Sequence, residues 1–147
     1  MITLYGVYRS RASRPLWVAH ELGLAYEHVP VNYQNSGTRT PEFLALNPNG
    51  KVPMLERVDG GILVESNAIL CWLAEGSTHL PDDAWERAQA LSWLFFEQYS
   101  HEPYVAVARF IQLYLGMPEA RREEHARCLA LGYKALRVME KQLERTP

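Results

Sequence analysis

A mixed α/β domain followed by an all-helical domain is the architecture that the sequence predicts, and two observations support it. Over the first 76 residues, short β-compatible segments alternate with helical segments, whereas every periodic segment from residue 83 onward has helical spacing. A connector that contains Pro81 separates the two parts. We therefore predict one domain at residues 1–76 and a second at residues 83–147.

The first domain begins with a strand and a helix. Ile2–Tyr5 is a β-compatible segment that Gly6 closes. Ser13 is placed to cap the helix that follows, and Pro15 falls in its first turn, where the missing N–H costs nothing. Gly23 is a natural stop, since glycine readily adopts the left-handed conformation in which many helices end.

Further strands and helices give the first domain the order β-α-β-α-β-β-α, which predicts a mixed four-stranded sheet with helices packed on it. The predicted strands are Tyr26–Val31, Val52–Leu55 and Ile62–Val64, and the predicted helices are Pro41–Leu46 and Asn67–Glu75. Residues 59–61, with the sequence Asp-Gly-Gly, are a hairpin signal between the last two strands. Ser66 is expected to cap the last helix.

The second domain is predicted to consist of long amphipathic helices. Pro103 should kink the first of them, which continues to Gly116, and Pro118 opens the next. The apolar face of the first helix comprises Ala84, Ala88, Leu91, Phe95 and Tyr99, and that of the second comprises Leu129, Tyr133, Leu136 and Leu143. Such stripes need a third or fourth helix to cover them, so we expect an incomplete helical bundle.

Composition argues against several classes of protein. The formal net charge is −2, so no excess of Lys or Arg is available to neutralise the phosphates of a nucleic acid. The apolar runs are too short to span a membrane, and the N-terminus lacks the pattern of a signal peptide. Cys71 and Cys128 both lie in helical segments, which argues against a disulfide framework and fits a reducing cytoplasm. No metal-ligand spacing surrounds the five histidines, so no metal is expected.

Several motifs, in this order and spacing, resemble those of the glutathione S-transferase family. They are Leu4-Tyr5-Gly6, Ser10-Arg11-Ala12-Ser13-Arg14, Asn47-Pro48-Asn49-Gly50-Lys51-Val52-Pro53 and Glu65-Ser66-Asn67-Ala68-Ile69. The segment 93–103 is similar to the first helix of the second domain in bacterial members. The resemblance covers the whole chain. It implies a thioredoxin-like first domain, glutathione as the co-substrate, and a second domain that is cut short relative to the family.

Ser10 is the catalytic residue that the resemblance implies, because it matches the serine-type members of the family. It lies just before a predicted helix, whose N-terminus stabilises an anion and lowers the pKa of a thiol held there. A serine hydroxyl that donates a hydrogen bond to the thiolate lowers that pKa further. Two alternatives stay open: Ser10 is a solvated loop residue, or Ser13 contacts the thiol instead.

Val52 and Pro53 are expected to bind the peptide backbone of glutathione. The proline interrupts the predicted strand, and the resemblance implies a cis Val52–Pro53 bond that leaves the Val52 N–H and C=O facing outward. These two groups could pair with the ligand as with an added strand.

The two ends of glutathione are assigned to four further residues. Glu65 and Ser66 begin the last helix of the first domain, where the carboxylate and the ammonium group of the γ-glutamyl end could be held. Arg39 and Lys51 are cationic candidates for the glycyl carboxylate. The structural alternatives are a capping serine after an acidic residue, and cations that are simply solvated.

The second domain would supply the wall that faces the hydrophobic substrate. Tyr104, Arg109 and Phe110 lie past Pro103 and are the candidates, with core or surface positions as the equal alternative. Cys71 is expected to be a small core residue rather than a nucleophile.

The predicted function is conjugation of the glutathione thiol to small hydrophobic electrophiles, for which a lowered thiol pKa and proximity suffice. The alternative is a catalytically weak scaffold that serves dimerisation or protein interaction. The resemblance also implies a homodimer that pairs through segments 68–73 and 85–98, where large apolar groups occupy more than one helix face.

Overall fold

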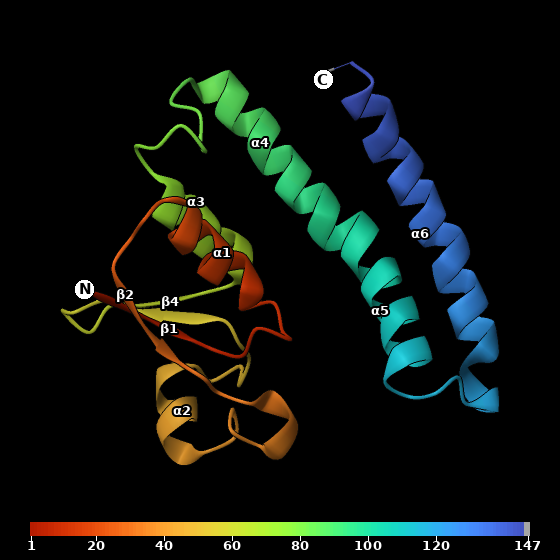
Figure 1. Ribbon diagram of the computed structural model, residues 1–147, viewed down its shortest axis with the longest axis horizontal. Helices are drawn as coiled ribbons and strands as arrows, with labels where there is room; N and C mark the ends of the chain where they lie inside the picture. Colours follow the sequence, from red (N-terminus) through yellow and green to blue (C-terminus); the bar gives the residue numbers. More distant parts are fainter. Residues whose placement is uncertain (146–147) are drawn as a thin grey trace. The chain divides into compact units, whose positions relative to one another are not determined.

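The computed structural model describes residues 1–145, which fall into two compact units (Figure 1). The first unit ends at Asp82 and the second begins at Asp83. Within the described residues, no helix is both long enough and apolar enough to cross a membrane.

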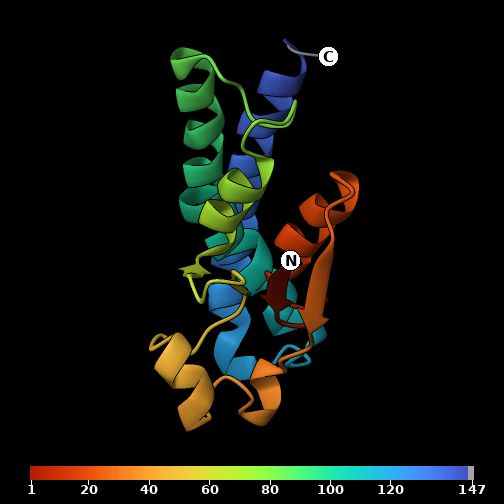
Figure 2. The ribbon, with the colours of Figure 1, turned by 90° about the vertical axis from the view of Figure 1, so that its left-hand side faces the viewer.

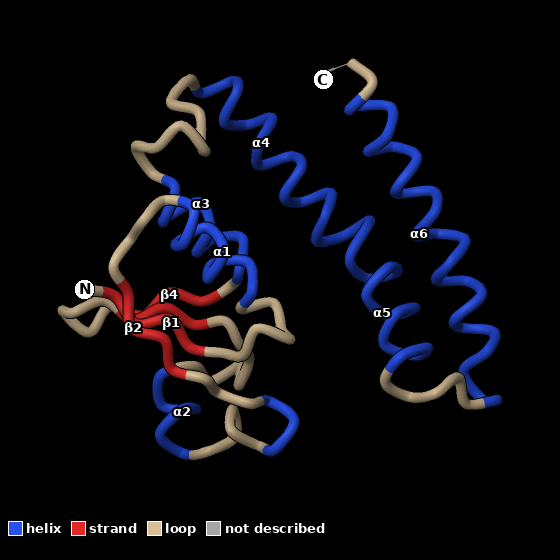
Figure 3. The backbone as a smooth tube through the Cα atoms, in the orientation of Figure 1, coloured by secondary structure: helices blue, strands red, loops and turns tan. Residues whose placement is uncertain are grey.

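The first unit is built on a four-stranded mixed sheet, as predicted (Figure 3). Its strands are β1 (Ile2–Tyr5), β2 (Tyr26–Val29), β3 (Met54–Glu56) and β4 (Ile62–Val64). The spatial order is β2-β1-β3-β4, with β1 and β2 parallel and the other two pairs antiparallel. A parallel pair requires a crossover connection, and α1 (Ser13–Glu21) provides it.

Helices cover both faces of this sheet. α1 and α3 (Ser66–Ala74) pack against each other on one face, and α2 (Pro41–Leu46) lies on the opposite side (Figures 1 and 3). The core between the sheet and the helices α1 and α3 is apolar. It consists of Leu4, Ala12, Leu16, Ala19, Leu55, Ile69 and Leu73. Each of these residues is at most 7% exposed, so this face carries the main hydrophobic stabilisation of the first unit.

Two predicted helix caps are wrong. α1 begins at Ser13, whose hydroxyl donates a hydrogen bond to the Ser10 carbonyl at 3.0 Å, and the N-cap residue is Ala12. α3 begins at Ser66, and its N-cap residue is Glu65. Each serine lies one residue inside its helix, so its hydroxyl is not placed to accept from a first-turn N–H and bonds to other groups instead.

The remaining boundaries of the first unit follow from backbone chemistry. Gly23 has a φ of 62° and ends α1, as predicted. β2 stops at Val29, short of the predicted Val31. β3 starts at Met54 because Pro53 has no N–H to contribute to the ladder.

The second unit contains helices and, over residues 83–145, no strand, as predicted. Its elements are α4 (Ala84–Phe96), the π-helical turn η2 (Glu97–His101), α5 (Glu102–Leu113), the 3₁₀ turn η3 (Glu119–Arg121) and α6 (Arg122–Leu143). α5 and α6 lie side by side (Figures 1 and 2). Asp83 caps α4, because its Oδ1 accepts hydrogen bonds from the N–H groups of Trp85 and Glu86, each at 3.0 Å.

Pro103 was expected to kink the first long helix, and the structure has the π-helical turn η2 directly before it. Pro103 lies in the first turn of α5, directly after the π-helical turn. The Glu102 N–H donates to the carbonyl of Glu97, five residues back instead of four. Proline removes an N–H from the helical ladder, and the wider π-helical turn before it accommodates that loss.

The residues predicted for the apolar stripes of the long helices are largely exposed, as expected for an incomplete bundle. The buried residues of α6 are small or polar, namely His125, Cys128, Gly132 and Ala135. A Cβ on Gly132 would lie 3.2 Å from the Val105 side chain, so α5 and α6 approach each other closely at this glycine. The larger residues Leu129, Tyr133, Leu136 and Leu143 are 40–60% exposed. Four residues of the stripe predicted for the first long helix are exposed as well, namely Ala84, Ala88, Phe95 and Tyr99.

Tyr5 provides a test of the sheet. It donates a hydrogen bond to Glu56 across β1 and β3 at 2.5 Å, and this bond raises the pKa of Tyr5 to about 12. We expect Tyr5→Phe to lower the free energy of unfolding by about 1 kcal/mol at neutral pH. Because the folded-state pKa lies above the ordinary value of 10.0, the contribution is complete below pH 10 and is lost as the pH rises through 12.

Urea unfolding of wild type and Tyr5→Phe, at neutral pH and near the raised pKa, measures this difference. Tyr33→Phe is the matched control, since Tyr33 is 42% exposed in the loop before α2, and it should leave stability unchanged. A Tyr5→Phe deficit that stays constant at alkaline pH would contradict the hydrogen-bond explanation.

Candidate functional site

Three segments of the first unit meet where β1 ends. Gly6 follows β1 with a φ of 133°, a conformation that favours glycine. A Cβ at this position would lie 2.5 Å from that of Ala12 and 3.1 Å from that of Val52. The absent side chain therefore lets the loop before α1 and the segment before β3 both pack against the end of β1.

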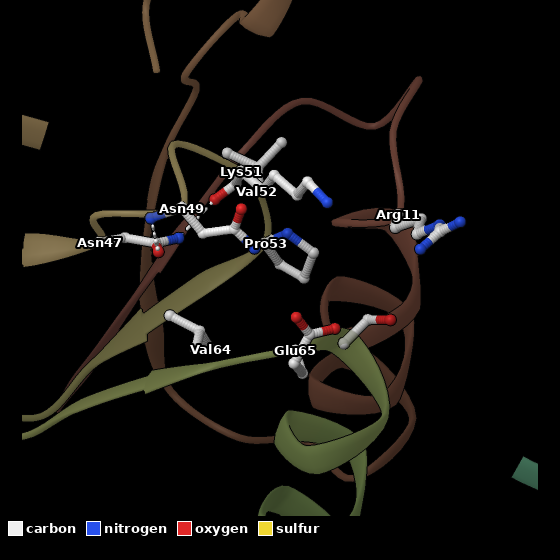
Figure 4. A pocket seen from close by; sticks show the side chains of 9 residues that line it. Arg11, Asn47, Asn49, Lys51, Val52, Pro53, Val64 and Glu65 are labelled. Carbon is white, nitrogen blue, oxygen red and sulfur yellow. Dashed lines mark hydrogen bonds between the residues drawn. The ribbon is translucent and has the colours of Figure 1, made fainter. Parts of the chain in front are cut away.

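A pocket forms where these segments meet the start of α3 (Figure 4). Five of the six predicted glutathione-binding residues line it, with four others: Lys51, Val52, Pro53, Glu65 and Ser66, together with Arg11, Asn47, Asn49 and Val64. Figure 4 shows Arg11 across from Lys51 and Val52, and Glu65 pointing toward Pro53. None of these four was predicted as a site residue, although Arg11, Asn47 and Asn49 belong to the motifs that carry the family resemblance.

Val52 lines this pocket. The Val52–Pro53 peptide bond is cis, as predicted. Tyr5 pairs with Met54 at the end of the β1–β3 ladder, so Val52 lies beyond the paired residues. Across residues 1–145, no hydrogen bond within the chain engages the Val52 N–H or C=O. An extended peptide in the pocket could pair with both groups in the manner of an added strand.

Glu65 and Ser66 form the floor of the site at the start of α3. Glu65 has a φ of 70° and a ψ of 117°, a conformation that costs a non-glycine residue about 1–3 kcal/mol. Backbone strain of this kind concentrates at ligand sites. Ser66 is 3% exposed, and its hydroxyl accepts a hydrogen bond from Arg14 at 3.2 Å. The first-turn N–H groups and the dipole of α3 attract a carboxylate to this position.

Asn47 holds the loop that carries Lys51 and Val52. Its side chain is buried, its Nδ2 donates to the Lys51 carbonyl at 2.8 Å, and its Oδ1 accepts from the Asn49 N–H at 3.2 Å (Figure 4). Its own carbonyl accepts from the Gly50 N–H at 2.9 Å. One buried amide therefore fixes the turn that leads into Val52.

The predicted cations differ in their positions. Lys51 is exposed and lines the pocket, whereas Arg39 lies outside the lining. The Arg39 guanidinium packs against Gly50, where a Cβ would lie 2.5 Å from its Nη1. Arg11 supplies a second cation to the lining, so the pocket carries two cations and one carboxylate, that of Glu65. This balance favours a ligand with net negative charge.

Ser10 lies half-buried in the loop before α1, and its hydroxyl has two partners. It donates to the Val7 carbonyl at 2.7 Å and accepts from the Ala12 N–H at 3.1 Å. Both bonds belong to the turn that leads into α1. Ser10 does not line the pocket, whereas its neighbour Arg11 does. The Ser13 hydroxyl is directed into the same turn through its bond to the Ser10 carbonyl.

The candidate residues for the hydrophobic-substrate wall all lie in the second unit. Tyr104 is half-buried, with its Cβ 3.9 Å from the Cβ position of Gly132 on α6. Arg109 lines a groove of about 280 Å³ between α5 and α6. Phe110 stacks on Tyr114 with ring centroids 5.7 Å apart. Their contact with a substrate stays a prediction.

Comparison with known proteins identifies the family. A family model described as the N-terminal domain of glutathione S-transferase matches residues 1–75, about half of the chain. This chain belongs to the glutathione S-transferase family. A crystal structure of a glutathione S-transferase from Pseudomonas fluorescens is 56% identical, with a TM-score of 0.95, and the match covers 99% of this chain and 73% of that one. Glutathione S-transferase 3 of Zea mays is 37% identical over 98% of this chain and 68% of the relative.

A glutathione transferase from Pseudomonas putida was solved with one glutathione disulfide bound per subunit. It is 30% identical, with a TM-score of 0.85, over 97% of this chain and 65% of that one. The matches confirm the predicted thioredoxin-like first domain and the helical second part of a glutathione S-transferase. The chain spans only 28–52% of the length of several other curated relatives that it matches.

Asn47→Asp tests how this family member holds its pocket loop. The substitution keeps Oδ1 but replaces the donor to the Lys51 carbonyl with an oxygen, so a buried acceptor loses its partner. We expect the free energy of unfolding to fall by about 2 kcal/mol, measured by urea denaturation. Asn35→Asp, an exposed site with the same change of charge, is the control and should be neutral. Equal stability of the two variants would show that the amide does not hold the loop.

Proposed function

We propose that this chain binds glutathione in the first-unit pocket and conjugates its thiol to small hydrophobic electrophiles. The observation that carries the proposal is that the backbone N–H and C=O of Val52 have no hydrogen-bond partner among the described residues, in a residue that lines the same pocket as Glu65 and Ser66. Glutathione is an extended peptide with a carboxylate at each end and one ammonium group. The glutathione disulfide bound to the Pseudomonas putida relative supports this assignment.

The pocket residues suggest the orientation of the peptide. The cysteinyl backbone pairs with Val52, and the γ-glutamyl carboxylate meets the hydroxyl of Ser66 and the first-turn N–H groups of α3. The carboxylate of Glu65 accepts from the ammonium group. Lys51 meets the glycyl carboxylate, and Arg39, which packs against the preceding Gly50, adds positive charge at longer range. This orientation directs the thiol toward the loop before α1.

The start of α1 would favour the glutathione thiolate in two ways, through the dipole of the helix and through the hydroxyl of Ser10. The N–H groups of Ser13 and Arg14 already donate to loop carbonyls at 3.1 and 3.2 Å, so α1 acts mainly through its dipole. Ser10 would give up its bond to the Val7 carbonyl and donate to the thiolate instead. A charge-assisted hydrogen bond is stronger than the neutral one that it replaces, so the exchange is favourable once the thiolate forms.

The conjugation step follows from this arrangement. The thiolate sulfur attacks the electrophilic carbon and forms a C–S bond. The displaced electron pair departs with the leaving group or, in an addition, is protonated by water. Proximity and a lowered thiol pKa provide the rate enhancement, while Tyr104, Arg109 and Phe110 remain the proposed surface that faces the electrophile.

We further propose that the protein acts as a cytoplasmic homodimer. Within residues 1–145, Cys71 and Cys128 form no disulfide, which is typical of a reducing compartment. Large apolar side chains are exposed in α3 and α4, where Trp72 is 42%, Trp85 73% and Phe95 70% exposed. A symmetric interface that includes these two helices would remove them from water.

Ser10→Ala tests the catalytic assignment. We expect the pKa of the bound glutathione thiol to rise by about one unit, because the variant loses a hydrogen bond that favours the thiolate alone. The affinity for glutathione should change little. Ultraviolet absorbance of the thiolate, followed against pH in the presence of saturating glutathione, measures the pKa, and calorimetry measures the affinity.

Ser13→Ala is the matched control and should leave that pKa unchanged. A raised pKa in Ser13→Ala alone would move the catalytic assignment to Ser13. A wild type that binds no glutathione at millimolar concentration while folded would refute the proposed function. Binding without conjugation of a generic aromatic electrophile would favour the alternative of a catalytically weak scaffold.

Assembly is tested by sedimentation at micromolar concentration. We expect a single species of twice the 16.9 kDa chain mass, because an apolar interface of this kind should be saturated there. Trp85→Lys should dissociate it. Trp17→Lys, at a tryptophan of α1 that is 69% exposed, is the matched control and should remain dimeric. A wild type that sediments as a monomer would contradict the proposal.

A further inference from the structure

Arg14 links the starts of two helices that pack side by side. It lies in the first turn of α1, and its Nη1 donates to the Ser66 hydroxyl at 3.2 Å and to the Asn67 Oδ1 at 3.4 Å. Both acceptors belong to the first turn of α3. Arg14 is half-buried and Ser66 is almost fully buried, so the contact is shielded from bulk water.

The direction of this hydrogen bond constrains the hydroxyl of Ser66. A guanidinium can only donate, whereas a serine hydroxyl has one proton to donate and two lone pairs that accept. Since the oxygen accepts from Arg14, the hydroxyl proton must point elsewhere. The same nitrogen also engages Asn67 Oδ1, a neighbouring acceptor toward which that proton could otherwise turn. Ser66 lines the pocket, so its proton is available to an acceptor bound there.

We infer that Arg14 is a positioning residue that makes Ser66 a hydrogen-bond donor to a carboxylate of the bound ligand. The inference rests on the proposed binding of glutathione, and it concerns the γ-glutamyl carboxylate. Arg14 acts on this carboxylate in two ways: it fixes the polarity of the Ser66 hydroxyl, and it adds positive potential at the N-terminus of α3. Arg14 is therefore a determinant of specificity for an α-carboxylate at this end of the peptide.

Ligand-observed NMR titration of wild type and Arg14→Met, each with two ligands, tests the inference. One ligand is glutathione, and the other is γ-aminobutyryl-cysteinylglycine, which lacks only the γ-glutamyl α-carboxylate. We expect Arg14→Met to weaken glutathione binding about tenfold and to leave the affinity for the analogue unchanged. Arg14→Lys, which retains a donor for Ser66, should recover part of the loss, and it provides the same comparison if Arg14→Met folds poorly.

Two controls separate positioning from a general structural role. Arg57→Met alters an exposed arginine paired with Asp59 in the β3–β4 turn, and it should bind both ligands as the wild type does. In a Ser66→Ala background, Arg14→Met should cause only a small further loss. Equal weakening of both ligands by Arg14→Met, no weakening of either, or a full tenfold loss in the Ser66→Ala background would overturn the inference. A wild type that fails to bind glutathione would refute the proposed function and this inference together.

Discussion

The absence of a side chain at Gly6 is the constraint on which the first unit depends. The Gly6 N–H donates to the Val29 carbonyl at 3.0 Å, and its carbonyl accepts from His28 Nε2 at 2.7 Å, so the residue is tied to β2. On the other side, the Ala12 Cβ lies closer than a Cβ on residue 6 would permit, and the Val52 Cβ would make a tight contact with it. The end of β1 therefore joins β2, the loop before α1 and the segment before β3. The pocket exists because these segments cannot separate without breaking this contact.

Each wall of the pocket has its own support beneath it. The buried amide of Asn47 fixes the loop that bears Lys51, and Arg14 holds the start of α3 against the start of α1. Glu65 is held in a strained conformation that places its side chain toward Pro53. The groups that face the ligand are thus few, and the buried polar groups behind them determine where they point. A few ligand-facing groups held by buried polar groups are typical of sites that bind their ligand with little rearrangement of the protein.

The sequence predicts the sheet because its strands and turns depend on local signals, and it predicts the approximate site through the family resemblance. Strand segments and Gly23 specify their own conformation, whereas the cis Val52–Pro53 bond was implied by the family resemblance. Five of the six binding residues predicted with that resemblance line one pocket. The caps were not predictable, because Ser13 and Ser66 have the right chemistry but lie one residue inside their helices. Arg11 was missed because nothing local distinguishes a cation that lines a pocket from one in solvent. The buried face of α6 was missed because close packing selects small residues, whereas periodicity highlights large ones.

The π-helical turn has a consequence for comparing this chain with its relatives. An α-helix advances by about 100° per residue, and η2 takes up one residue more than an α-helical turn would. The faces of α4 and α5 are therefore out of phase, although the helical run from Ala84 to Leu113 is continuous. An alignment with a relative that lacks this extra residue requires a gap in the middle of a helix. Without that gap, the residues that pack on α6 would be matched to positions a quarter-turn or more away.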